Sequence, residues 1–255
     1  MIAPAMPRSD AELKTLFADF VVQGGWSLDR LAFRLRDTFR NISWQGKDVC
    51  EIGCGRGDYG MYMALNGARR VVALEPSAEG SSDAKTVHLH NRVDRLAMPN
   101  YSLLESKFEE CQFEPESFDL VFGIQVIEHI HETFQDLADD PAARASYEKA
   151  FAGFYRMLRP GGVLLLTDYS RRNVWTLLQK AFGPSFRGPL TRVIDWQMHQ
   201  HPRTWQRLAR DTGFERTDLW WRVYQPLKHM PWLADNRIFA YFTFASFVFS
   251  AYKAS

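Results

Sequence analysis

A glycine-rich segment behind a short apolar run carries the clearest chemistry in this sequence. The apolar run reads as a buried strand that contains Glu51, and Gly53, Gly55 and Gly57 follow it at alternate positions. Glycine accepts positive φ and has no Cβ, so such a turn lets a ligand lie directly against the backbone. About 20 residues later a second apolar run ends in Glu75, where a carboxylate can accept hydrogen bonds from both hydroxyls of a ribose. The pattern predicts a site for a nucleoside cofactor.

Two cofactor classes fit this pattern. Residues 55–60 satisfy the G-x-G-x-x-G spacing of dinucleotide-binding enzymes, with an acid at the expected distance. In a nicotinamide site, however, the strand should run straight into the first glycine, so that the pyrophosphate meets the helix N-terminus. Here Gly53 and Cys54 intervene. A carboxylate such as Glu51 beside the turn suits an ammonium or sulfonium group and repels a phosphate. A nicotinamide oxidoreductase therefore remains only as an alternative.

The frame Glu-x-Gly-x-Gly-x-Gly at residues 51–57 resembles the first motif of class I S-adenosylmethionine-dependent methyltransferases. Later segments resemble further blocks of that family in the same order, at residues 117–123, 124–130, 158–166 and 201–214. The resemblance implies an α/β fold with a Rossmann-like, seven-stranded, mostly parallel sheet, helices on both faces and an antiparallel last strand. It implies S-adenosyl-L-methionine as the cofactor and a small or medium-sized acceptor, methylated at an oxygen of a sugar, glycan precursor or natural product. An RNA methyltransferase is the second alternative.

The resemblance also implies which residues contact the cofactor, from the methionine portion through the ribose to the adenine. In chain order they are Glu51, Gly53, Cys54, Gly55, Gly57, Glu75, Pro76, Ser106, Lys107, Phe108 and Gln125. Those up to Gly57 surround the methionine portion, and Glu75 binds the ribose. The family usually has an aspartate after the third strand that accepts a hydrogen bond from the adenine amino group. This chain has none there, so Ser106, Glu105 or Glu109 would have to accept instead.

Glu128 and His129 raise the question of a metal ion. Some branches of the family bind a divalent ion through Glu-x-x-Glu-His at this place, but here the first position is Gln125. Losing one anionic ligand weakens a site for a hard cation, so we expect no metal. His129 then serves either as a general base or as a hydrogen-bonded structural residue.

Asp195 and His199 form the other dense group of polar residues. On a helix they would lie four residues apart on one face, within hydrogen-bonding reach. A carboxylate that orients an imidazole raises its basicity, which is a common acid–base arrangement. We therefore predict His199, oriented by Asp195, as the first candidate for the catalytic base and His129 as the second. The alternative is that the pair only fixes an inserted segment to the core. His201, just before Pro202, is expected to cap a helix.

Strand and helix patterns alternate along the chain, which predicts a parallel sheet with right-handed crossovers. The predicted strands are residues 47–52, 70–75, 101–105, 118–123 and 162–169, with a closing antiparallel pair at 214–223 and 243–252. The predicted helices are residues 9–23, 27–40, 58–67, 124–138 and 143–158 and a late helix near 202–213, whereas 77–99 reads as irregular. We expect an N-terminal helical cap at residues 1–42 and a methyltransferase domain at 43–255, with a lid insertion at about 170–201.

Composition narrows the class of protein. The net charge of +1 over 255 residues does not fit a dedicated binder of nucleic acid, which is usually clearly basic. The insertion carries Arg171, Arg172, Arg187 and Arg192 with no acid before Asp195, which suggests an anionic small-molecule acceptor. The three cysteines lack a disulfide or zinc pattern and are compatible with the cytoplasm. No signal peptide is visible, and the uncharged stretch 238–252 is too short to cross a bilayer, so we expect no membrane insertion.

Overall fold

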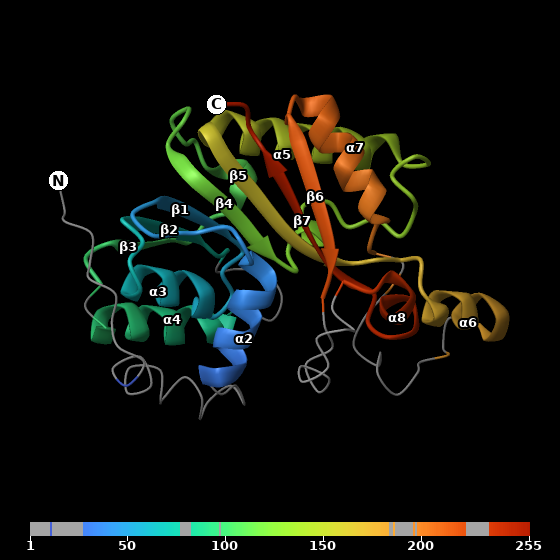
Figure 1. The fold of residues 1–255 in the computed structure, drawn as a ribbon, viewed down its shortest axis with the longest axis horizontal. Coiled ribbons are helices and arrows are strands. Elements are labelled where there is room, and N and C mark those ends of the chain that lie inside the picture. The colour runs from blue at the N-terminus through green and yellow to red at the C-terminus, as the bar shows by residue number, and fades with distance from the viewer. Residues whose placement is uncertain are drawn as a thin grey trace. The chain divides into compact units, whose positions relative to one another are not determined.

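The computed structural model describes residues 11, 28–76, 83–96, 98–183, 186, 196, 198–222 and 235–255. Seven strands form one sheet in the order β3-β2-β1-β4-β5-β7-β6 (Figure 1). β7 is antiparallel to both of its neighbours, whereas β1, β2, β3 and β4 pair in parallel. The predicted fold class, a Rossmann-like sheet with an antiparallel last strand, is confirmed.

The chain divides into two units, which are described separately. The first unit comprises residues 1–123 and 157–162, and the second comprises residues 124–156 and 163–255. The predicted division into a cap at 1–42 and a catalytic domain at 43–255 stays a prediction, and the predicted helix at 9–23 lies outside the described residues except for Ala11.

The first unit holds the parallel strands that precede the glycine turn and Glu75. Its elements are α2 (Leu28–Phe39), β1 (Asp48–Ile52), α3 (Asp58–Leu65), β2 (Arg70–Leu74), α4 (Asp83–Leu96), β3 (Tyr101–Leu104), the 3₁₀ turn η2 (Phe108–Glu110) and β4 (Phe118–Ile124), whose last residue belongs to the second unit. All five residues of β1 are buried, as expected of a central parallel strand. The predicted strands 47–52, 70–75, 101–105 and 118–123 are confirmed to within one residue at each end.

An ion-pair network lies where β1 begins. Asp48 accepts hydrogen bonds from Arg69 at 2.6 and 2.8 Å and from Arg159 at 2.8 Å, and Arg159 also donates to Asp119 at 2.9 Å. Burial opposes ionisation of Asp48, but these guanidinium groups and Arg70 hold its pKa below the usual value. This carboxylate is therefore saturated with positive partners.

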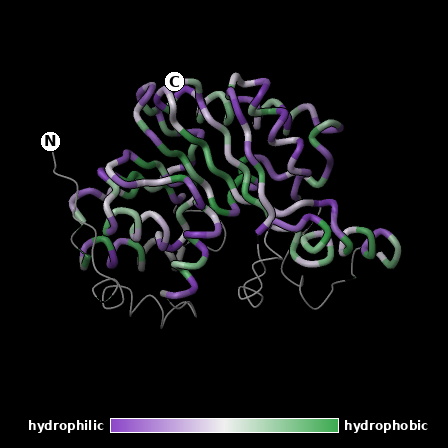
Figure 2. Tube along the Cα trace, viewed as in Figure 1, coloured by the Kyte–Doolittle hydropathy of each residue, from purple (hydrophilic) through white to green (hydrophobic). Residues whose placement is uncertain are grey.

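The second unit surrounds the antiparallel strands. Its elements are the 3₁₀ turn η3 (Ile127–His129), α5 (Pro141–Met157), β5 (Leu158–Tyr169), α6 (Val174–Phe182), α7 (Pro202–Thr212), β6 (Arg216–Trp221), α8 (Arg237–Phe242) and β7 (Ser246–Tyr252), with residues 157–162 of α5 and β5 assigned to the first unit. Leu166 of β5 and Leu219 of β6 both pair with Phe249 of β7. Figure 2 shows hydrophobic residues concentrated along the strands, in agreement with the buried runs of β5 and β7. The predicted closing strand pair is confirmed, and no helix among the described residues is long and apolar enough to cross a membrane.

Two predictions of local structure were wrong. Residues 83–96, expected to be irregular, form α4, in which Leu89 and Leu96 are buried at helical spacing. Residues 124–138 were expected to form a helix, but the helical part of this described segment is limited to the 3₁₀ turn η3. Gln125 has a left-handed φ of 52°, which an L-residue adopts only with strong support. Its N–H donates to the carbonyl and the hydroxyl of Thr167 at 3.1 and 3.0 Å, and this pairing with β5 replaces the first turn of a helix.

Candidate active site

The turn after β1 is built from alternating left-handed glycines. Gly53, Gly55 and Gly57 have φ values of 61°, 55° and 72°, which only glycine adopts without strain. Gly57 precedes the first residue of α3, and a Cβ there would lie 2.6 Å from the side chain of Leu89. A Cβ at Gly55 would meet nothing within 4 Å, so the backbone is open on that side. The turn can thus accept a ligand against its main chain.

Two glutamates hold this turn from adjacent strands. Glu75, directly after β2, accepts a hydrogen bond from the N–H of Gly55 at 2.7 Å. Glu51, inside β1, accepts from the N–H of Gly60 at 3.0 Å. Both side chains are buried. A Cβ on residue 60 would collide with the Glu51 carboxylate, which explains the glycine in the first turn of α3.

The electrostatics of this turn distinguish between the two cofactor classes. Burial raises the pKa of Glu51 well above its usual value, and the carboxylates of Asp58 and Glu75 raise it further. Burial also raises the pKa of Asp58, although Arg56 and Arg92 partly offset this effect. Three acids around one turn disfavour a pyrophosphate and favour a positively charged ligand with hydroxyl donors. The residues present therefore fit S-adenosyl-L-methionine, whose sulfonium and ammonium groups are cationic.

The predicted adenine segment follows β3. The hydroxyl of Ser106 donates to the carboxylate of Glu110 at 3.0 Å, and the N–H of Lys107 donates to the same oxygen at 3.3 Å. Phe108 begins η2, while Glu105 lies 2.5 Å from a ring nitrogen of His90. The acid that meets Ser106 is thus Glu110, which the sequence reasoning missed. A glutamate three residues after the cap position of a helical turn is a recognised capping signal that could have indicated it.

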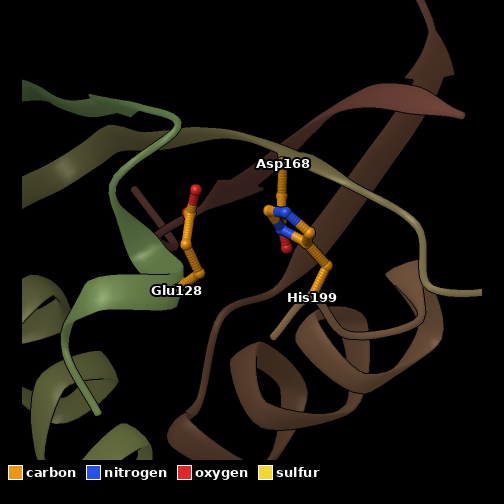
Figure 3. A group of neighbouring side chains, drawn as sticks. All are labelled: Glu128, Asp168 and His199. Atoms are coloured by element: carbon orange, nitrogen blue, oxygen red, sulfur yellow. The ribbon is translucent and has the colours of Figure 1, made fainter. Parts of the chain in front are cut away.

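A second group of polar side chains lies in the second unit, where Glu128, Asp168 and His199 meet (Figure 3). Their ligand atoms all lie within 4.8 Å of one another, and their exposed fractions are 6%, 1% and 5%. Glu128 belongs to η3 after β4, Asp168 is the penultimate residue of β5, and His199 precedes α7. Segments far apart in the sequence therefore bring these three groups together.

Asp168 is held by three N–H donors. Nδ1 of His199 lies 2.6 Å from Oδ1, the backbone N–H of Tyr169 donates to the same oxygen at 2.7 Å, and Nε1 of Trp205 donates to Oδ2 at 3.0 Å. Because an ionised carboxylate only accepts, the Nδ1 of His199 carries the proton in this pair. The imidazole lone pair then resides on Nε2, the arrangement of a general base oriented by a carboxylate.

Glu128 differs from Asp168 in its partners. Its Oε2 is buried and has no hydrogen-bond partner in the structure. Burial, reinforced by the Asp168 carboxylate, raises its pKa to about 8, and His199 partly offsets the rise. Glu128 is therefore mostly neutral at pH 7. The three groups could also ligate a divalent cation, but both oxygens of Asp168 already accept N–H bonds, which favours acid–base chemistry; the expected absence of a metal stays a prediction.

Of the predicted catalytic residues that the structure describes, His199 lies in the buried cluster and His129 lies outside it. The carboxylate partner of His199 is Asp168, whereas the predicted partner Asp195 lies outside the described residues. His129 lies one residue after Glu128, but its side chain is exposed and its Nδ1 is 3.4 Å from Glu132. His201 caps α7 by accepting from the N–H of Arg203 at 3.2 Å, as predicted.

The sequence reasoning assigned Asp168 no catalytic role. Its position at the end of a predicted strand was the available signal, but nothing in the local sequence linked it to a histidine 31 residues away. Trp205, which fixes its second oxygen, gave no signal either, because a tryptophan in an amphipathic helix is normally read as core.

This chain is similar in sequence to known methyltransferases. Residues 50–166 match the family model for a methyltransferase domain. A probable S-adenosylmethionine-dependent methyltransferase of Mycolicibacterium smegmatis is 31% identical over 126 residues, which are 49% of this chain and 39% of that protein. A ubiquinone biosynthesis O-methyltransferase of Psychrobacter arcticus is 27% identical over 200 residues, 75% of this chain and 68% of the relative. The chain thus spans well under half of the first relative and about two thirds of the second.

The fold is also found among solved structures. Phosphoethanolamine N-methyltransferase 2 of Haemonchus contortus, in complex with S-adenosyl-L-methionine, superposes with a TM-score of 0.60 at 17% identity, over 94% of this chain and 57% of that one. At this identity the likeness concerns the fold alone.

Proposed function

We propose that this chain, a class I S-adenosylmethionine-dependent methyltransferase, uses S-adenosyl-L-methionine to methylate an oxygen of a small molecule. We choose oxygen as the acceptor atom because of the buried pair of Asp168 and His199, in which Nδ1 of His199 lies 2.6 Å from Oδ1 of Asp168. A hydroxyl must lose its proton as the methyl group arrives, and an oriented imidazole is a suitable acceptor for that proton.

The cofactor residues proposed from the resemblance have distinct tasks in the first unit. When bound, S-adenosyl-L-methionine supplies an electrophilic methyl group on a positively charged sulfur. Glu51, buried and paired only with the Gly60 N–H among the contacts described, is proposed to stabilise the positive end of the methionine portion. Glu75 offers about four lone-pair sites, of which Gly55 takes one, and is proposed to bind the ribose hydroxyls. Ser106 and Pro76 remain the proposed adenine contacts.

The proposed proton acceptor belongs to the second unit. Nε2 of His199 takes the acceptor's proton, and the resulting imidazolium is stabilised by Asp168, whose position Trp205 and the Tyr169 N–H fix. The positive imidazolium also lowers the pKa of Glu128, which favours the ionised carboxylate beside it. General-base catalysis of this kind contributes about 10²- to 10⁴-fold to a rate.

The acceptor class rests on the relatives and on charge. The relatives that are similar in sequence include a ubiquinone biosynthesis O-methyltransferase and a phosphoethanolamine N-methyltransferase of Arabidopsis thaliana. The net charge of +1 gives no support to an RNA acceptor. A small-molecule acceptor with a negative charge is therefore our proposal. The cytoplasmic location is also kept as a proposal, supported by three free cysteines.

Substitution of the histidine tests the function. We expect His199→Gln to lower kcat by about 10²-fold or more, while leaving the affinity for S-adenosylhomocysteine unchanged, with methyl transfer measured on a panel of phenols, sugar phosphates and phosphoethanolamine. His129→Gln is the matched control, because that imidazole is exposed and should not contribute. Near wild-type turnover of the His199 variant would exclude it as the base, and absence of S-adenosylhomocysteine binding by the wild type would refute the methyltransferase itself.

A further inference from the structure

A charged cavity lies in the second unit, between the loop after η3 and one face of α6. Its volume is about 620 Å³, and its lining includes Asp136, Asp139, Arg171, Arg172, Thr176 and Lys180. This volume is in the range of pockets that bind small molecules. We propose that the cavity binds the phosphate group of the methyl acceptor, with Arg171, Arg172 and Lys180 as its cationic contacts. The proposal rests on the proposed function in that it takes the acceptor to be a small molecule.

Arg171 supplies the strongest geometric argument. One guanidinium nitrogen, Nη2, donates to the backbone carbonyl of Phe134 at 3.0 Å, which fixes the plane of the group. The other, Nη1, is buried and has no hydrogen-bond partner in the structure. A buried N–H donor without an acceptor is costly, and burial also lowers the pKa of this guanidinium, although Asp136 and Asp139 counteract that effect. An anion in the cavity would offset the electrostatic part of this cost, because an opposite charge nearby favours the charged guanidinium.

The remaining donors come from α6 and from the residues just before it. Thr176 and Lys180 lie four residues apart in α6, so they share one face of the helix, whereas Arg172 precedes the extended N-cap residue Asn173 and lines the same cavity. Asn173 fixes the start of the helix, because its side chain accepts from the N–H of Thr176 at 2.9 Å. A guanidinium, an ammonium and a hydroxyl thus line the cavity from this short part of the chain. Guanidinium and ammonium groups arranged in this way bind phosphate oxygens with charge-assisted hydrogen bonds.

The two aspartates limit what else the cavity can bind. Asp136 is engaged with its own loop, since it accepts from the N–H of Ala138 at 3.2 Å. Neither Asp136 nor Asp139 lies within ion-pair distance of Arg171 or Arg172 in the structure, and three cations outnumber two acids. The cations are therefore available to a ligand rather than consumed by the acids.

Inorganic phosphate is the probe that tests this cavity. Calorimetric titration at constant ionic strength, with chloride as the balancing anion, should show binding by the wild-type chain. Arg172→Gln and Lys180→Gln should each weaken it about tenfold, the usual effect of removing one charge-assisted hydrogen bond. Arg172 and Lys180 are exposed, so neither change should disturb folding. Arg207→Gln, an exposed arginine of α7 outside the cavity, is the matched control and should bind phosphate like the wild type.

A variant of opposite sign sharpens the test. Asp139→Asn removes a negative charge from the same cavity and should tighten phosphate binding several-fold. A wild type that does not bind phosphate at ~10 mM, or cavity variants that bind it as the wild type does, would overturn the proposal. Titration of the same samples with S-adenosylhomocysteine keeps the two proposals apart, because cofactor binding would persist if only the phosphate site were wrong.

Discussion

Strand β1 carries an acid near each of its ends, and the two acids have opposite surroundings. Asp48, at the start, accepts hydrogen bonds from Arg69 and Arg159, which hold its pKa below the usual value against the effect of burial. Glu51, near the end, is buried with one backbone N–H and neighbouring carboxylates, and its pKa is raised. An acid such as Asp48 that is paired with arginines stabilises the folded chain without a ligand. A buried acid without a cation is instead expected where a ligand supplies the missing positive charge.

The largest effect expected from this contrast concerns Glu75, the second acid at the ligand end. Glu75→Ala should weaken S-adenosylhomocysteine binding by about 10²-fold or more, because two ribose hydroxyls lose a charged acceptor worth about 1.5–3 kcal/mol each. Calorimetric titration of each variant with S-adenosylhomocysteine measures this affinity. Glu114→Ala, an exposed acid of the same unit, should bind as the wild type does. Unchanged affinity in the Glu75 variant would show that Glu75 does not bind the cofactor.

Asp48→Asn is the complementary change at the other end of the strand. Removing the charge leaves Arg69 and Arg159 with one neutral amide oxygen in place of a charged carboxylate, and we expect the free energy of unfolding to fall by about 2–3 kcal/mol. Denaturant titration gives this value. The affinity for S-adenosylhomocysteine should stay within about twofold, because no ligand contact is proposed at this end. A large loss of cofactor affinity with full stability would contradict the distinction between the two ends.

The smallest effect is a change in pH dependence. The folded-state pKa of Glu51 is raised, so its stabilising contribution is complete below the unfolded-state pKa of about 4.3 and is lost as the pH rises toward the folded-state value. Glu51→Gln should abolish this loss in the cofactor-free chain, because the amide oxygen can still accept from Gly60. Denaturant titration between pH 5 and 9 measures the slope. An identical slope in wild type and variant would show that Glu51 is already ionised.

The sequence predicted those parts of the fold that local patterns determine. Strands β1 to β4, the glycine turn and the cap at His201 each depend on neighbouring residues: apolar runs, left-handed glycines, and a polar residue before Pro202. Helix α4 was missed because its many polar residues obscured the helical spacing of Leu89 and Leu96.

The features that depend on distant contacts could not be predicted. Gln125 leaves the helical conformation because Thr167, 42 residues later, binds its N–H. In the same way, Asp168 meets His199 and Trp205 across 31 and 37 residues. The sequence reasoning predicted His199 as a catalytic base oriented by Asp195, because helical spacing suggested that carboxylate, whereas the carboxylate beside His199 in the structure is Asp168. The roles of Asp168 and His199 in catalysis remain proposals.

Three consecutive residues before α7 each make a separate attachment. His199 contacts Asp168, Gln200 bonds to the backbone of Gln135 and Leu137, and His201 caps the helix. The imidazole is thus fixed by its own contact with Asp168 and by the attachments of the two residues that follow it. A substitution elsewhere in the second unit that preserves these attachments therefore leaves the proposed proton acceptor in its place.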